Sequence, residues 1–232
     1  MKGSIKYICG IFFISILTSC FTLDSEVDNY SDVYITSKII NNDTMFALGA
    51  FSQSNNSLDS VTLIGPDNRK YSLIQFKTFS YFEKEIDSSE YINSVPTIGD
   101  YTFTYYYSDN TSAEEIVTLE NTLADISTID SISVDDDYNT ITVYWQKAND
   151  VDYYSVRIYD EDSAIFLSDL ITSDTSAYNI STVSSTWTTY PEDGKTYNLE
   201  INSIKLDLYN YTNYINYLCI SSSEQVDFVW PK

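Results

Sequence analysis

The chain of 232 residues contains no histidine. Ser-His-Asp and Cys-His nucleophilic catalysis both need an imidazole base, so neither can operate here. Metal sites ligated by histidine are excluded on the same ground. A pair of carboxylates, as in glycoside hydrolysis, is the catalytic option that remains, but among 34 acidic residues finding two of them means nothing. We therefore expect a protein that is not an enzyme.

Cysteine is nearly as scarce, with three in the whole chain. Cys9 lies inside an apolar N-terminal run and Cys20 follows that run, which leaves Cys219 without a partner. We expect the fold to stand without disulfides even if the protein is exported. Cys219 is then expected to be a small core residue rather than a reactive thiol.

Basic residues are also few, since 12 lysines and arginines stand against 34 aspartates and glutamates, a net charge of −22. Such a surface repels nucleic acids and anionic lipid headgroups, so neither is expected as a partner. The charge does not indicate disorder. Hydrophobic residues make up 43% of the chain and aromatic residues 16%, with 22 tyrosines, which is ample material for packed cores.

The N-terminus carries a targeting signal. Two lysines precede an apolar run that ends at Leu17 and is too short to span a bilayer comfortably. The following residues complete the sequence Leu-Thr-Ser-Cys, which resembles the lipobox of bacterial lipoproteins. The resemblance implies that residues 1–19 are a signal peptide and that the thiol of Cys20 is acylated and holds the chain to a membrane. The alternative is an ordinary secretory signal whose cleavage region contains a cysteine.

Residues 20–32 are polar and acidic and show no periodicity. We interpret them as the lipidated Cys20 followed by a flexible tether. An acidic stretch directly after the lipidated cysteine also resembles the export signal of outer-surface lipoproteins in Gram-negative bacteria. That resemblance implies an outer-membrane location facing the cell exterior, although a plain solvated tether would have the same composition.

From Val33 onward, apolar and polar residues alternate with a period of two, which is typical of β-strands with one face in a core. The alternation is clear along Asp100–Tyr107 and around Trp145, Tyr154 and Tyr197. No window of twelve residues sustains a capped helical pattern. The sequence therefore predicts an all-β protein.

Two short motifs relate the halves of the chain. Gly99 precedes Tyr101 at the start of a strong strand, and Gly194 precedes Tyr197 in the same way, 96 positions later. This spacing is close to the roughly 100 residues of one immunoglobulin-like sandwich. Each motif resembles a tyrosine corner, in which the phenol hydroxyl bonds to the loop backbone and fixes the crossover between sheets.

Residues 123–232 resemble a fibronectin type III domain, because the strands of Trp145 and Tyr154 and the second corner follow that family's order. Residues 33–122 resemble a looser immunoglobulin-type sandwich. The resemblance implies two tandem antiparallel β-sandwiches with separate cores.

The segment 206–214 carries three tyrosines. In a type III sandwich it would be the loop between the last two strands, at the same end of the domain as the loop 147–152. Aromatic faces flanked by hydrogen-bonding groups suit a sugar ring or a partner loop. The alternative is that this Tyr-rich segment simply extends a strand. The candidate binding residues are Tyr209, Tyr211, Tyr214, Lys147, Asp150 and Asp152.

Three acidic loops could supply oxygen ligands for calcium: Asp135-Asp136-Asp137, Asp150 with Asp152, and Asp160 with Asp162. None has the spaced pattern of a dedicated calcium loop, and aspartate is also a favoured turn residue, so solvated turns are the stronger interpretation. No metal ligand and no cofactor are predicted.

These features favour a non-catalytic, lipid-anchored surface protein that recognises a glycan or a surface-protein partner. The alternative is a structural spacer or assembly subunit that holds something else away from the membrane. Glycan recognition predicts exposed, coplanar aromatic rings at a loop end. A spacer predicts none, together with a stiff joint between the domains.

Overall fold

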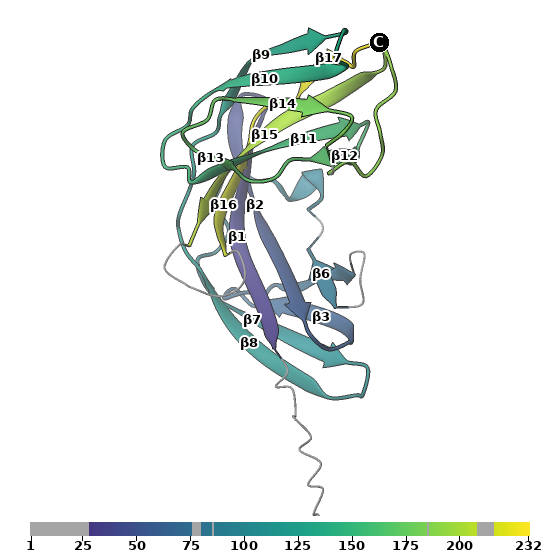
Figure 1. The fold of residues 1–232 in the computed structure, drawn as a ribbon. Coiled ribbons are helices and arrows are strands. Elements are labelled where there is room, and N and C mark those ends of the chain that lie inside the picture. The colour runs from purple at the N-terminus through teal and green to yellow at the C-terminus, as the bar shows by residue number, and fades with distance from the viewer. Residues whose placement is uncertain (1–27, 76–79, 85, 185, 208–215) are drawn as a thin grey trace, which may run out of the picture.

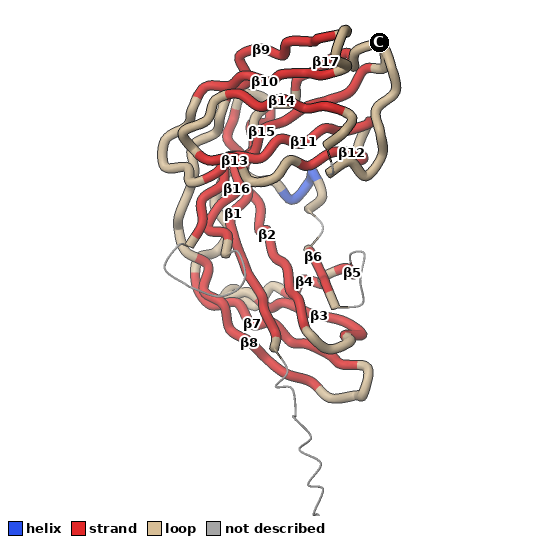
Figure 2. Tube along the Cα trace, viewed as in Figure 1, coloured by secondary structure: helices blue, strands red, loops and turns tan. Residues whose placement is uncertain are grey.

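The computed structural model describes residues 28–75, 80–84, 86–184, 186–207 and 216–232. In these residues the chain consists of β-strands and one short 3-10 helix, η1 (Ser88–Glu90), so the all-β prediction is confirmed. The strands build a tall, curved molecule with an upper and a lower lobe (Figure 1). The helix lies between the lobes (Figure 2). No helix in this part of the chain is long and apolar enough to cross a membrane.

One sheet of ten strands passes through both lobes. Its members are β1 (Asn29–Ile40), β2 (Asp43–Ser54), β5 (Ile74–Gln75), β6 (Tyr81–Glu83), β11 (Tyr153–Asp160), β12 (Ser163–Leu167), β13 (Ile171–Thr172), β15 (Thr196–Leu206), β16 (Tyr217–Ser222) and β17 (Val226–Val229). The strands follow the order β12-β11-β15-β16-β1-β2-β6-β5, with β13 paired to β11 and β17 paired to β15.

Two smaller sheets complete the lobes. The lower sheet has the order β4-β3-β7-β8 and the upper sheet the order β14-β10-β9. Their strands are β3 (Leu58–Ile64), β4 (Lys70–Ser72), β7 (Gly99–Tyr107), β8 (Ser112–Leu119), β9 (Thr128–Asp135), β10 (Thr140–Gln146) and β14 (Ala177–Ser181). Each packs its apolar face against the large sheet, as the layers of a β-sandwich do.

The alternation of the sequence decides which face each strand buries. In β7 the side chains of Tyr101, Phe103 and Tyr105 are buried, while Thr102 and Thr104 between them are half-buried on the other face. In β10 the buried set is Ile141, Val143 and Trp145. Successive strand residues point to opposite faces, so this pattern places one face of each small sheet in the core.

The hairpin of β1 and β2 joins the lobes, because its two antiparallel strands both extend through the lower lobe and the upper one (Figure 1). The upper part of β1 also pairs with β16, with Ile35 opposite Cys219 and Lys38 opposite Ser222. This pair is parallel, unlike the antiparallel pairing that we expect from the sequence. Parallel neighbours need no hairpin between them, so two segments far apart in the chain can meet in this way. The other pairings among the described strands are antiparallel.

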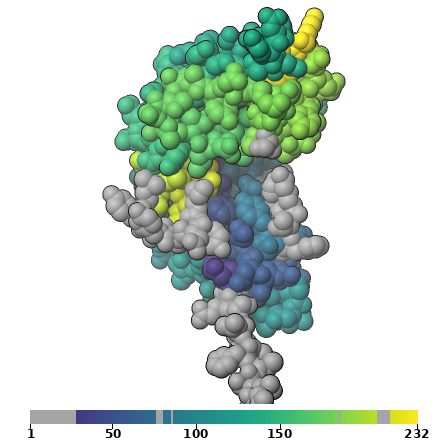
Figure 3. All heavy atoms as spheres, viewed as in Figure 1, coloured from purple at the N-terminus to yellow at the C-terminus, as the bar shows by residue number. Residues whose placement is uncertain are grey.

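The core is shared as well. A single cluster of buried residues contains Leu63 and Phe103 from the lower lobe, Ile35 from the joint, and Trp145 and Leu199 from the upper lobe. The separate cores expected from the sequence are therefore not found in the described residues. In the space-filling view, yellow residues near the C-terminus lie between the two lobes, beside purple and blue residues of the first half of the chain (Figure 3).

The predicted tether is too long by at least four residues, since β1 begins at Asn29. Asp32 belongs to this strand and is buried. Its carboxylate accepts a hydrogen bond from the backbone N–H of Tyr217 at 2.6 Å, and burial raises its pKa to about 8. This acidic residue can lie in a buried strand because a backbone N–H gives its carboxyl group a partner and because the raised pKa leaves that group largely uncharged at neutral pH.

Both tyrosine corners have the backbone bond that defines the motif. The Tyr101 hydroxyl donates to the Thr97 carbonyl at 2.9 Å, and the Tyr197 hydroxyl accepts from the Glu192 N–H at 2.7 Å. Gly99 and Gly194 before them have positive φ values of 132° and 73°. Glycine adopts such angles without the strain that a side chain would cause.

Three further residues singled out in the sequence lie in the upper core. The rings of Trp145 and Tyr154 meet edge to face, with centroids 5.4 Å apart. The Tyr154 hydroxyl accepts from the backbone N–H of Ala148 at 2.9 Å. Cys219 is fully buried and its raised thiol pKa follows from burial, which makes it a core residue.

Candidate functional site

The loop-end site predicted from the sequence lies half outside the described residues, because Tyr209, Tyr211 and Tyr214 fall in the segment 208–215. The other three candidate residues, Lys147, Asp150 and Asp152, are described, and two of them make contacts within the fold. Asp152 accepts from the backbone N–H of Leu206 at 3.0 Å and its carboxylate lies 3.3 Å from the ammonium of Lys205.

The neighbours of Asp152 have similar roles. The ammonium of Lys147 donates to the backbone carbonyl of Asp174. Asp150 is exposed and adopts a left-handed backbone angle of 55° in the turn. The structure thus places these three side chains at one loop end, where two of them stabilise the backbone of that end.

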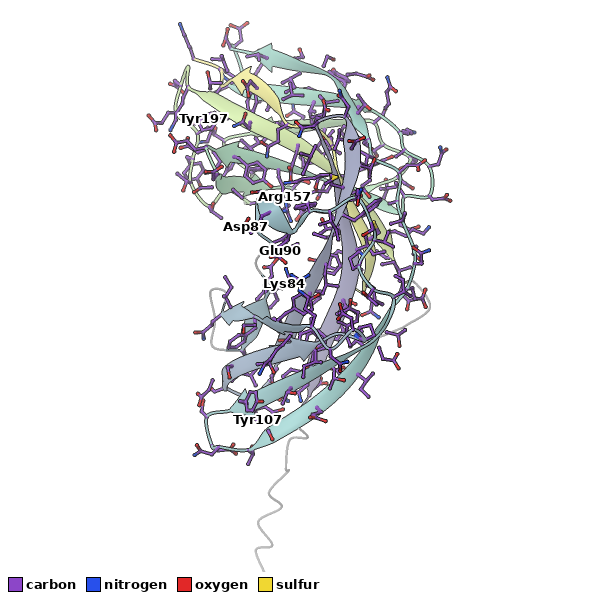
Figure 4. All side chains as sticks on the ribbon, turned by 180° about the vertical axis from the view of Figure 1, so that it is seen from behind. Lys84, Asp87, Glu90, Tyr107, Arg157 and Tyr197 are labelled. Atoms are coloured by element: carbon purple, nitrogen blue, oxygen red, sulfur yellow. The ribbon has the colours of Figure 1, made fainter. Side chains whose placement is uncertain are left out.

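A well-formed hollow lies elsewhere, on the concave side of the molecule between the lobes. It has a volume of about 470 Å³. We call it the Arg157 hollow; its lining residues are Tyr34, Thr36, Lys38, Ile74, Glu83, Lys84, Ile86, Tyr91, Arg157, Tyr159, Glu161, Asp162, Glu200, Ile220, Ser222 and Gln225. Figure 4 shows Lys84 and Glu90 on one side of it and Arg157 on the other.

The floor of the hollow is the outer face of the large sheet. In β11 the core takes Tyr154, Val156 and Ile158, so Arg157 and Tyr159 point away from the core. The same alternation puts Glu200 of β15 and Tyr34, Thr36 and Lys38 of β1 on this face. These side chains lie side by side only because β16 and β1 are paired.

A charged network organises the floor. Arg157 and Glu200 are directly opposite each other on neighbouring strands. The Tyr159 hydroxyl donates to one oxygen of Glu200 at 2.7 Å, and the Gln225 amide donates to the other at 3.4 Å. Burial opposes the charge of Arg157, but Tyr159 and Glu200 outweigh it and raise the guanidinium pKa. Arg157 therefore stays cationic beside Glu200.

The wall of the hollow is formed by residues of the first half of the chain, including Lys84 and Tyr91. Backbone hydrogen bonds attach this wall to β2 at two points. Phe46 and Ile92 exchange N–H···O bonds of 2.7 and 2.9 Å, and the Lys84 N–H donates to the Ala50 carbonyl at 2.8 Å. Between these points, Tyr91 faces the floor and the ammonium of Lys38 lies 4.1 Å from the centroid of its ring. The cation–π contact holds this ring over β1.

Helix η1 supports the wall through its cap. The carboxylate of Asp87 accepts from the Ser89 N–H at 2.8 Å, and Glu90 accepts from the Asp87 N–H at 3.3 Å, a capping box. The second oxygen of Glu90 lies 2.6 Å from the ammonium of Lys84, whose side chain is buried. Hydrogen bonds and an ion pair therefore hold the wall of the hollow, as hydrogen bonds hold its floor.

Tyr34 at the base of the hollow is positioned by a glycine. It lies opposite Gly49 in the β1–β2 register, and its ring covers the space that a side chain at position 49 would occupy. A Cβ at this position would overlap the Tyr34 ring. Glycine is thus required here by close approach rather than by backbone angle.

A second hollow of about 270 Å³ continues along the same sheet face. It shares Arg157 and Ile220 with the first hollow. Its other lining residues are Ser155, Leu167, Ser168, Asp169, Leu170, Asn202, Ile204 and Tyr217. Leu167 and Leu170 are exposed there, at 45% and 37% of their surface.

The acidic loops considered for calcium serve as turns. Asp135 accepts from the backbone N–H groups of Asp137 and Tyr138 at 3.1 and 3.3 Å, and Asp136 accepts from that of Lys232 at 3.1 Å. Asp160 lies 2.7 Å from the ammonium of Lys195. The described part of the chain contains no group of three acidic or cysteine residues placed to hold a metal ion.

Comparison with known proteins leaves the family open, since no family model and no curated protein matches the chain. A two-domain fibronectin type III segment of chicken tenascin aligns with 88% of this chain and all of its own at 16% identity and a TM-score of 0.28. A β-1,2-glucanase from Parabacteroides distasonis aligns with 89% of this chain and 37% of its own, at 8% identity and a TM-score of 0.33. Murine CEACAM1b aligns with 85% of this chain and 98% of its own, at 11% identity and a TM-score of 0.27. Likeness at this level assigns neither a family nor an activity.

Proposed function

We propose that this chain is a non-catalytic, lipid-anchored surface protein that binds a glycan in the Arg157 hollow. The observation that carries the proposal is the convergence of Tyr91 and Tyr159 with Arg157 and Glu200 in one concave space, with the buried Tyr34 at its base. Tyrosine rings offer stacking area to the C–H faces of sugars at low entropic cost. The charged side chains can donate to and accept from sugar hydroxyls.

Preorganisation supports the same proposal. Tyr159 and Gln225 both donate to Glu200, and the capping box holds the wall. A ligand that enters this space therefore meets side chains whose rotamers are largely fixed, which lowers the entropic cost of binding. The sheet that continues through both lobes is what the spacer hypothesis predicts, whereas a pure spacer has no need of such a hollow.

A glycan array tests the proposal. The labelled protein is expected to bind a defined set of glycans, and Tyr91→Ala is expected to weaken that binding by roughly 1–2 kcal/mol, the scale of a truncated aromatic contact. The matched control is Tyr190→Ala, because Tyr190 is 66% exposed and does not line the hollow. Melting curves of both variants separate lost binding from lost folding. A protein that binds no glycan on the array supports the spacer hypothesis.

The membrane anchor is the second part of the proposal and depends on Cys20, which lies outside the described residues. Acyl chains supply the hydrophobic area that holds an acidic, otherwise soluble chain to a membrane. Metabolic labelling with a fatty acid is expected to mark the wild-type protein and not Cys20→Ala. Equal labelling of the two proteins contradicts the lipoprotein assignment and favours an ordinary secretory signal.

A further inference from the structure

From the two adjoining hollows we infer that the glycan is an uncharged sugar chain that crosses Arg157 and occupies both at once. The inference rests on the proposed function of the Arg157 hollow and adds the class and extent of the ligand.

The extent follows from the continuity of the sheet face. Both hollows lie on the outer faces of β11, β15 and β16, and Arg157 and Ile220 line both. A compact ligand would fill one hollow and leave the other to water. A chain of linked sugars that lies across the strands contacts both and passes over the guanidinium of Arg157.

Arg157 is suited to this central position. Tyr159 and Glu200 lie beside its guanidinium, whose five N–H donors can also reach hydroxyl groups of a ligand. The planar group also offers a flat face to the ring above it. One residue can thus bind two neighbouring sugar units.

The charge of the lining decides against an anionic ligand. The Arg157 hollow has three basic residues and four acidic ones. They are Lys38, Lys84, Arg157, Glu83, Glu161, Asp162 and Glu200. Two of the bases are already engaged, Lys84 by Glu90 and Lys38 by the ring of Tyr91. The chain as a whole carries a net charge of −22 and repels anions over the distances that screening allows.

Hydroxyl groups match such a mixed lining better than ions do. A hydroxyl donates to Glu83 or Glu200 and accepts from Arg157, so both signs of charge are used without an ion to desolvate. In the second hollow the exposed side chains of Leu167 and Leu170 provide an apolar surface for the C–H face of another sugar unit.

Isothermal titration of the purified protein with neutral malto-, cello-, manno- and xylo-oligosaccharides of increasing length tests the inference. Oligogalacturonates of the same lengths are the charged probes. We expect at least one neutral series to bind, with an affinity that rises with length until both hollows are covered, and the charged series to bind more weakly. Arg157→Leu is expected to weaken binding of short and long members alike.

A variant of the second hollow isolates the role of chain length. Leu170→Asp is expected to weaken the long members roughly tenfold, the scale of a lost contact residue, and to leave the shortest binding member unchanged. Leu167→Asp provides a second variant of the same kind if the first is misfolded. Val183→Asp is the matched control, because Val183 is 90% exposed and lines neither hollow.

The outcomes separate the inference from the proposal beneath it. If neutral probes bind without any gain from length, or if Leu170→Asp and Leu167→Asp change nothing, the two-hollow ligand is wrong while the Arg157 hollow remains a glycan site. Tighter binding of oligogalacturonates overturns the uncharged class. If no probe of either kind binds, the proposed function itself is wrong.

Discussion

Replacement of Trp230 by alanine is expected to lower the free energy of unfolding by about 3–5 kcal/mol, the range for a large aromatic residue removed from a core. Only 1% of the Trp230 side chain is exposed. Its ring meets Trp187 edge to face at 5.3 Å, and its indole N–H donates to the side chain of Asn139 at 2.8 Å. Chemical denaturation followed by circular dichroism measures the loss.

Two variants at the same end of the chain control for this result. Trp230→Phe keeps an aromatic ring but leaves Asn139 without its donor, so an intermediate loss is expected. Val229→Ala removes a side chain that is 50% exposed and should change the stability little. A loss below about 1 kcal/mol for Trp230→Ala would mean that the C-terminal strand does not close the upper lobe.

Ile35→Ala is expected to cost about 2–5 kcal/mol, and both lobes should lose that stability together. Ile35 is fully buried and lies opposite Leu48 on one side and Cys219 on the other. It therefore belongs to the strand that carries the shared sheet from one lobe into the other. Because Ile35 belongs to the main core cluster, which contains buried residues of both lobes, a cavity at this point is expected to weaken both lobes together.

Two probes distinguish joint from separate unfolding. All three tryptophans, Trp145, Trp187 and Trp230, lie in the second half of the chain, so fluorescence monitors the upper lobe. Hydrogen exchange of β3 and β7 monitors the lower lobe. Ile116→Ala, at a site 66% exposed on β8, is the control with little expected change. A fluorescence midpoint that moves while the exchange of β7 stays unchanged would show two independent domains.

Much of the fold could be predicted from local sequence. The alternation along Asp100–Tyr107 identifies a strand and its buried face, and the Gly99 and Gly194 motifs identify two turns with their backbone bonds. These features depend on residues close together in the chain. The parallel pairing of β1 with β16 depends on segments about 180 residues apart, and nothing local encodes it.

The candidate site was missed for the same reason. Arg157 and Tyr159 are recognisable as outward-facing residues of one strand, and Glu200 of another, and each alone reads as a solvated surface residue. They form a hollow because β1 adds Tyr34 and Lys38 beside them and because Tyr91 is held opposite. The predicted loop site instead relied on tyrosines that are close together in the chain, and such a cluster is easily recognised in a sequence.

The acidic start of the folded part gives a second example. Asp32 reads as tether because a carboxylate is costly to bury. The hydrogen bond from the backbone N–H of Tyr217 and the raised pKa of the carboxyl group together make its burial possible, and Tyr217 comes from the far end of the chain. Composition alone therefore placed the beginning of the fold too late.

The most direct measurement of the central claim is a crystal structure of the protein with a neutral oligosaccharide that binds on the array. The account predicts the sugar in the Arg157 hollow, with a ring against Tyr91 and hydroxyls within hydrogen-bonding distance of Arg157 and Glu200. An ordered sugar at the loop end of Lys147 and Asp152, with the Arg157 hollow holding only water, would contradict it.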